Sequence, residues 1–151
     1  MNPTRNLLAI GMVALMGNTS ASADDAKEEA VEYRKSVYEV IAWNFGPMVG
    51  MVKQEIPFDA EVFARNAKRM AVMAPMVAEG FIPDSITDDS TAKPEIWERW
   101  DEFQAGLDKL TEESAKLSAL ASQGAPLPAL GQQVGAVGQT CKGCHDEFRK
   151  E

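Results

Sequence analysis

Apolar residues recur at alternating spacings of three and four along four separate stretches of the chain: 24–53, 59–78, 94–121 and 126–148. Such spacing places the apolar side chains on one face of an α-helix, whereas a strand alternates with a period of two, and no segment of useful length does so. The connections are short apart from a polar loop over 79–93. The pattern therefore predicts an all-α fold, an antiparallel up-down-up-down four-helix bundle.

The third stretch has the most regular pattern, and Ser114 fills its one gap. Asp59 is expected to cap the start of the second helix and Gly124 the end of the third. Pro47 is expected to kink or shorten the first helix. Arg34 interrupts the first apolar stripe and needs a polar partner if it is buried. The stripe of the third helix comprises Ile96, Trp100, Phe103, Leu107, Leu110, Leu117 and Ala121.

The first 23 residues match a secretory signal peptide. Arg5 gives a positive start, residues 7–16 are apolar, and Ala21-Ser22-Ala23 offers a cleavage site of small residues. The apolar run is too short to span a bilayer, although an uncleaved anchor stays open as an alternative. We expect cleavage near Ala23, export to the periplasm, and a single domain over residues 24–151.

The charge of the chain narrows its partners. The formal net charge is −8 at pH 7, and this excess disfavours nucleic acid and anionic membranes. Basic redox proteins and small neutral molecules remain as possible partners.

The chemistry of the chain is concentrated near its end, in Cys141-Lys142-Gly143-Cys144-His145. C-x-x-C-H is the attachment pattern of c-type haem, in which each thiol forms a thioether. The two cysteines share a helical face, and His145 is the only histidine available as an imidazole ligand. A thioredoxin-like motif would open a helix within a βαβ unit, structural zinc needs four ligands, and a disulfide within one helix would serve little purpose. We therefore expect one haem c, bound through Cys141 and Cys144 with His145 on the iron, and attached after export.

The chain resembles cytochrome c′, a class II c-type cytochrome, over the whole exported part. The position of the haem motif near the C-terminus, followed by Phe148-Arg149-Lys150, supports the resemblance. Three further segments match: Tyr33-Arg34-Lys35-Ser36, Trp43-Asn44-Phe45-Gly46 and Lys93-Pro94-Glu95-Ile96-Trp97. The resemblance implies an iron with histidine as its one protein ligand, and a homodimer formed by the first two helices.

The same resemblance implies roles for the residues around the haem. Tyr38 and Phe81 would lie over the open, distal side of the iron, although Tyr38 fits simple core packing as well. Arg149 would lie beside His145 on the proximal side, with a solvated cation at the helix C-terminus as the equal alternative. Arg34 would pair with a haem propionate. Weaker candidates around the propionates are Lys35, Thr91 and Lys93.

These features predict a periplasmic monohaem protein with five-coordinate, high-spin iron. It would transfer electrons and bind small diatomic gases, nitric oxide and carbon monoxide. The alternative is a six-coordinate, low-spin electron carrier, for which Met70 and Met73 are possible sixth ligands. An enzyme is not expected, because no second histidine can act as acid or base beside a peroxide.

Overall fold

The structure, a computed structural model, describes residues 22–150. The proposed signal peptide therefore lies outside the described residues as far as residue 21. The elements are α1 (Ala23–Val52), α2 (Ala60–Met73), the 3₁₀ helix η1 (Ala74–Gly80), α3 (Glu95–Glu98), α4 (Trp100–Ser122) and α5 (Leu127–Phe148).

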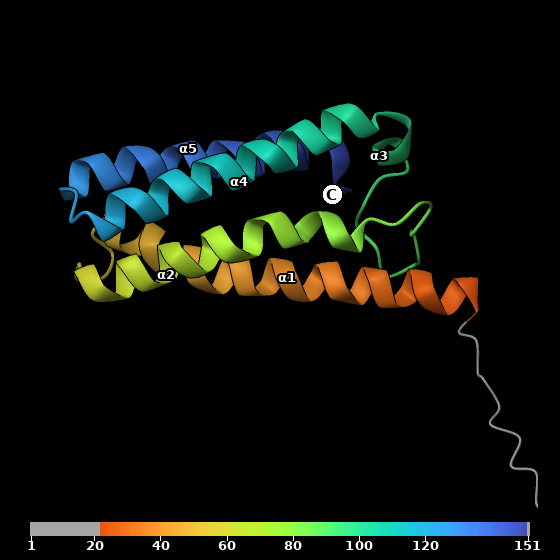
Figure 1. Ribbon diagram of the computed structural model, residues 1–151, viewed down its shortest axis with the longest axis horizontal. Helices are drawn as coiled ribbons and strands as arrows, with labels where there is room; N and C mark the ends of the chain where they lie inside the picture. The colour runs from red at the N-terminus through yellow and green to blue at the C-terminus, as the bar shows by residue number, and fades with distance from the viewer. Residues whose placement is uncertain (1–21, 151) are drawn as a thin grey trace, which may run out of the picture.

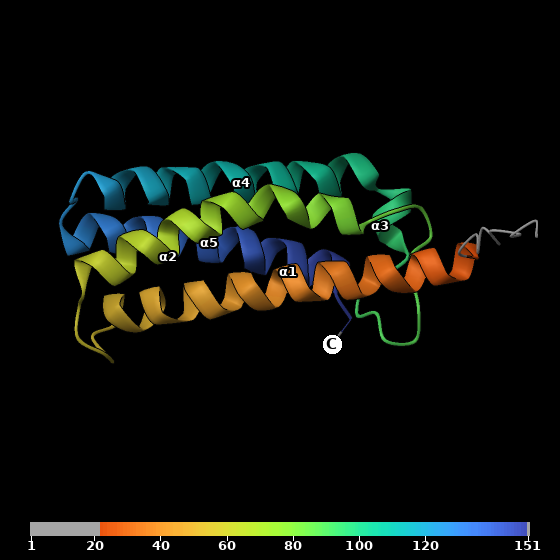
Figure 2. The same cartoon turned by 60° about the horizontal axis from the view of Figure 1, so that its bottom comes forward.

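The four long helices lie side by side and alternate in direction, which confirms the predicted bundle (Figures 1 and 2). Each packs against its neighbour in the sequence, and α1 also contacts α5, though less extensively than the other neighbours contact one another. The short α3, the loop before it and the end of α5 lie together at one end of the bundle (Figure 1). Among the described residues, no helix has the length and apolar character needed to cross a membrane.

The helix ends follow the predicted capping chemistry. The Asp59 carboxylate accepts hydrogen bonds of 3.0 Å from the backbone N–H groups of Glu61 and Val62, which caps α2. Gly124 follows α4 with φ of +69°, a conformation that favours glycine. At the start of α1, the Ser22 hydroxyl and the Asp25 carboxylate cap each other's backbone N–H groups.

Two boundaries differ from the sequence prediction, and one expected effect of a proline is absent. The second helix is α-helical only to Met73 and continues as η1, because Pro75 has no N–H to donate to the turn before it. The third helix is broken at Arg99, whose backbone leaves the helical region at φ −119° and ψ 41°. Arg99 is held there by Glu102 of α4 at 2.5 Å and Glu147 of α5 at 3.0 Å. Pro47 does not end α1, which runs to Val52.

The buried face of α1 is shifted from the predicted stripe. Val37, Asn44 and Met51 are buried in the core, whereas Tyr38 and Phe45 are only half-buried. The helix thus presents two adjacent stripes, one to the core and one to a cavity described below. On α4 the middle of the predicted stripe is confirmed, since Phe103, Leu107, Leu110 and Leu117 are all buried with Ser114 among them. Its ends, Trp100 and Ala121, are half-buried.

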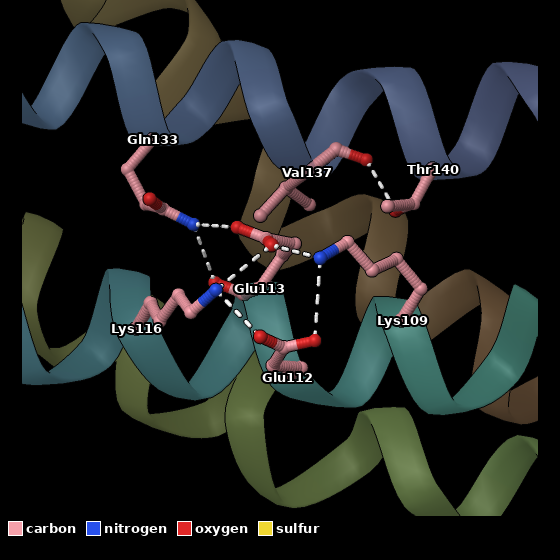
Figure 3. Close-up of polar contacts among 7 residues, drawn as sticks. All are labelled: Lys109, Glu112, Glu113, Lys116, Gln133, Val137 and Thr140. Carbon is pink, nitrogen blue, oxygen red and sulfur yellow. Dashed lines mark hydrogen bonds and ion pairs between the residues drawn. The ribbon is translucent and has the colours of Figure 1, made fainter.

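A polar network joins α4 to α5 halfway along the bundle (Figure 3). At its centre is Glu113, which is only 7% exposed although its neighbours in sequence are polar. Lys109 approaches the Glu113 carboxylate at 2.8 Å and Lys116 at 3.1 Å. Glu112 pairs with the same two lysines at the surface.

Candidate haem site

A cavity of about 570 Å³ opens between α1, α4, α5 and the segment between η1 and α3. We call this segment, residues 81–94, the wall loop. The volume lies within the range of pockets that hold cofactors, and the lining is mainly apolar. Two of its walls, α1 and α5, are the adjacent pair of long helices with the least contact between them.

The α5 wall carries the haem motif. Cys141, Cys144 and His145 all line the cavity, because the two cysteines continue the buried stripe of Leu130, Val134 and Val137 along α5. The thiols are not bonded to each other. Burial raises the pKa of Cys141, and it raises that of Cys144 to about 11. Within residues 22–150, no three acidic, cysteine or histidine side chains gather as a metal site would require.

The pKa of His145 is lowered from its ordinary value. Burial is the main cause, and the nearby positive charge of Arg149 adds to it. Both effects favour the neutral imidazole, which is the form that binds iron. Arg149 itself lines the cavity and joins the wall loop through an antiparallel bridge to Ala92.

The α1 wall faces this motif across the cavity. Arg34, Lys35 and Tyr38 line it. Burial raises the pKa of Tyr38 far above its ordinary value, and the buried thiol of Cys144 adds to the shift, so the phenol is a neutral O–H. The Lys35 ammonium donates to Glu32 at 2.7 Å, which leaves it at the rim of the cavity.

The wall loop carries three of the predicted residues, and two of them line the cavity. Phe81 and Thr91 line the cavity, but Lys93 does not. Its ammonium instead donates to the carbonyl oxygens of Glu147 at 3.0 Å and Asp146 at 3.4 Å. Lys93 therefore complements the C-terminal end of α5, and the geometry gives no support to its expected place beside a propionate.

Arg34 is buried, with 3% of its surface exposed. Burial lowers the pKa of its guanidinium. The polar partners that it needs are present within the protein: Nη1 and Nη2 donate to Gly80, Ser85 and Ser90. A haem propionate is thus not required to satisfy these donors.

Several lining residues were not singled out from the sequence. Gly106 on α4 and Gly138 on α5 leave room in the cavity: a Cβ at Gly106 would meet no atom within 4 Å, and one at Gly138 would meet only Phe45 at 4.0 Å. Glycine inside a helix is unfavourable, so two glycines within predicted helices were the sequence signal that could have indicated open space here. Others had no such signal, because their pattern is that of the core: Ile41, Ile96, Phe103, Leu107, Leu110 and Phe148.

The residues present fit a c-type haem. Two thiols lie on one helical face with an imidazole beside them, and the facing walls are apolar with open space at two glycines. Arg34, Lys35 and Arg149 are cations that could face the two carboxylates of a haem, and the same lining also holds Glu39 and Asp89.

Comparison with known proteins identifies one family. A family model described as Cytochrome C' matches residues 29–149. Cytochrome c′ of Halomonas halodenitrificans is 37% identical over 129 residues, which cover 82% of this chain and 98% of the relative. The structure of cytochrome c prime from Shewanella frigidimarina has a TM-score of 0.80 and 34% identity, and the match covers 83% of this chain and 97% of that one. A nitric oxide complex of a leucine-to-alanine variant of cytochrome c prime from Alcaligenes xylosoxidans has a TM-score of 0.77 and 34% identity, covering 83% and 96%.

The bundle and its cavity define a haem protein of the four-helix class. More narrowly, the chain belongs to the cytochrome c′ family. Its cofactor is haem c, the cofactor of that family.

Proposed function

We propose that one haem c is attached through Cys141 and Cys144, with His145 as the proximal ligand of the iron. When bound, the haem supplies an iron that accepts and releases one electron and binds small gases. The protein's part is to attach the group, hold the imidazole neutral and shape the space on both sides. The common lining of one cavity by the two thiols and the imidazole supports this assignment.

The iron is five-coordinate and high-spin in this proposal. The observation that carries it is the composition of the wall opposite the motif: within residues 22–150, no methionine lines the cavity. Met70 is fully buried in the core and Met73 is half-buried outside the cavity. The chain has no second histidine. Tyr38 and Phe81 lie on the distal side and limit the space for a ligand.

The open side suits small neutral molecules. Because the lining is mainly apolar and Tyr38 is un-ionised, nitric oxide and carbon monoxide fit better than charged ligands. A solved relative binds nitric oxide. We further propose that Arg149 lies beside the proximal ligand, since it lines the same cavity four residues after His145. No catalytic role is proposed, because the one histidine is used on the iron and leaves no imidazole for proton transfer.

Electron transfer in the periplasm completes the proposal. The basis for export is the predicted signal peptide of residues 1–23. A redox partner with a basic surface would be attracted to the negative charge of the chain, −8 at pH 7. Lys35 and Thr91 line the cavity and are also exposed to solvent. A redox partner can therefore dock on the surface at the rim of the cavity without entering it.

We propose a homodimer through α1 and α2. Val40, Trp43 and Pro47 share one face of α1, and Trp43 is 80% exposed while Val40 is 42% exposed. Val72 on α2 is 59% exposed. Exposure of the apolar Trp43 indole to water is unfavourable, so an exposed apolar patch of this kind marks a contact surface. The partner that the family resemblance implies is a second copy of the chain.

Gas binding to the reduced protein tests the proposed function. Titration of the dithionite-reduced protein with carbon monoxide, followed by absorbance, is expected to reach an endpoint at one gas molecule per haem. A chain with an iron already holding six ligands would show little or no change at the same gas concentrations, and the low-spin electron carrier would then replace the proposal.

A further inference from the structure

The wall loop depends on other segments for its position. Within itself it makes only short turns, in which Ser85 N–H donates to Ile82 at 3.2 Å and Ser90 N–H donates to Thr87 at 3.0 Å. Asp84 lies in the left-handed region at φ +55°. Yet this loop contributes Phe81 and residues 89–92 to the cavity wall. A segment with so little structure of its own needs outside contacts to form a defined wall.

Arg34 of α1 supplies these contacts at three points along the loop. Its Nη1 donates to the carbonyl of Gly80 and to the hydroxyl of Ser85, both at 2.8 Å. Its Nη2 donates to the carbonyl of Ser85 at 2.6 Å and to the hydroxyl of Ser90 at 2.7 Å. Both serines are buried, at 0% and 5% exposure. One planar guanidinium thus ties the last residue of η1 to two serines within the loop.

The same guanidinium fixes the distal aromatic residue. The Cζ atom of Arg34 lies 4.6 Å from the centre of the Phe81 ring, a distance at which a cation is attracted to the ring face. The other neighbour of Phe81 is Phe103 of α4, with ring centres 4.6 Å apart. Phe81 is therefore held between α1 and α4 at the cavity wall.

The junction of η1 and the loop is built for close approach to α1. A Cβ at Gly80 would lie 2.6 Å from the Cβ of Arg34 and 3.0 Å from the carbonyl oxygen of Ala30. Glycine is thus required where the Gly80 carbonyl reaches Arg34. The far end of the loop is anchored separately, because Lys150 N–H donates to Thr91 at 2.8 Å.

Arg34 has five N–H donors, and four of them are used in these bonds. Only Nε–H remains for any other acceptor. We infer that Arg34 is a positioning residue that clasps the wall loop through Ser85 and Ser90, and thereby sets the place of Phe81 and the passage of gas to the iron. This inference rests on the proposed haem site.

The test compares three variants of the holoprotein. The Ser85→Ala/Ser90→Ala pair removes two acceptors but keeps the charge of Arg34. Arg34→Lys keeps the charge but cannot reach three points with a fork of donors. Thr87→Ala is the matched control, since its hydroxyl makes no hydrogen bond to Arg34. Two quantities are measured: hydrogen exchange of the amides in residues 81–92, and the association rate of carbon monoxide with the reduced protein.

The serine pair and Arg34→Lys are each expected to speed loop exchange roughly tenfold, the effect of losing one or two such bonds. Carbon monoxide association should rise in both, while Thr87→Ala stays at the wild-type rates. Combining the serine pair with Arg34→Lys should add little, because both act on the same bonds.

Three results would overturn the inference: unchanged exchange in the serine pair, faster exchange with an unchanged gas rate, or wild-type behaviour of Arg34→Lys. If Arg34→Lys does not fold, the serine pair still decides the question. Failure of the proposed function itself would be seen separately, as absent gas binding in the wild-type protein, because loop exchange does not depend on the ligands of the iron.

Discussion

Gln133 of α5 donates a hydrogen bond of 2.6 Å to the carboxylate of Glu113 on α4, and a second of 3.0 Å to its backbone carbonyl (Figure 3). The bonds join two helices whose contact supports the cavity. With Lys109 first, then Gln133 and Lys116, the hydrogen bonds to the carboxylate lower the pKa of Glu113 to about 2 from an ordinary 4.5.

The network makes folding stability depend on pH in a defined direction. The folded-state pKa of Glu113 lies below the unfolded value, so its stabilisation is complete above about pH 4.5 and is lost as the pH falls towards 2. Glu113→Gln should be less stable than the wild type near neutral pH, and the difference should shrink on acidification. Denaturant unfolding across this range measures it.

Glu112→Gln is the control for that experiment. Glu112 pairs with the same lysines, but its side chain is 53% exposed, so water and salt screen the interaction. Its pH profile should stay closer to that of the wild type. Parallel profiles for the wild type and Glu113→Gln would show that the network does not stabilise the fold through this carboxylate.

Tyr38→Ala should open the distal side. If the ring lies in the path of an incoming ligand, carbon monoxide should bind about tenfold faster, which needs only about 1.4 kcal/mol less steric cost. Loss of this half-buried ring should also lower stability, by less than the roughly 3–5 kcal/mol of a fully buried aromatic, so stopped-flow mixing is done where the variant remains folded.

Tyr33→Ala is the matched control, because Tyr33 lies five residues earlier on α1 and its hydroxyl donates to Glu79 at 2.6 Å outside the cavity. Gas rates should not change there. Equal rates for the wild type and a folded Tyr38→Ala would place Tyr38 away from the ligand's path.

Removing both attachment points should remove covalent haem. In Cys141→Ala/Cys144→Ala no thioether can form, so haem should leave the chain on extraction with acidified acetone. Lys142→Ala is the control: Lys142 lies between the cysteines but pairs with Asp146 at the surface, and it should keep its haem. Covalent haem in the double variant would refute the assignment of the two cysteines.

Trp43→Glu should weaken the proposed dimer at least tenfold, because a carboxylate would have to be buried where an indole packed. Gln132→Glu is the control, since it adds the same charge at an exposed site on α5. Sedimentation at micromolar protein measures the mass. A wild-type protein that is monomeric under these conditions would contradict the dimer.

The sequence was sufficient for features that repeat or that carry unusual chemistry. The stripe of Phe103, Leu107 and Leu110 predicted a buried helical face, and the C-x-x-C-H motif predicted a haem wall on α5. Both follow from helical periodicity, which acts within one element. Burial of Arg34 was also predictable, because it interrupts an apolar stripe.

The partners of these residues were not predictable. Ser85 and Ser90 lie in a loop without periodicity, and only the folded chain brings them to Arg34 across about fifty residues of sequence. Glu113 was hidden for a different reason: it stands among charged residues on α4, whose pattern is that of a solvent face. The contact of Lys93 with the end of α5 was not predictable either, because it follows from the pairing of the wall loop with that end, which no local pattern reveals.

The most direct test of the account is the absorption spectrum of the purified wild-type protein in its ferric and ferrous states. With His145 as the one protein ligand, the account predicts the broad bands of high-spin haem in both states, and a ferrous spectrum that changes on addition of carbon monoxide. Sharp, split low-spin bands in the ferrous state, unaltered by carbon monoxide, would contradict it and show a sixth ligand from the protein.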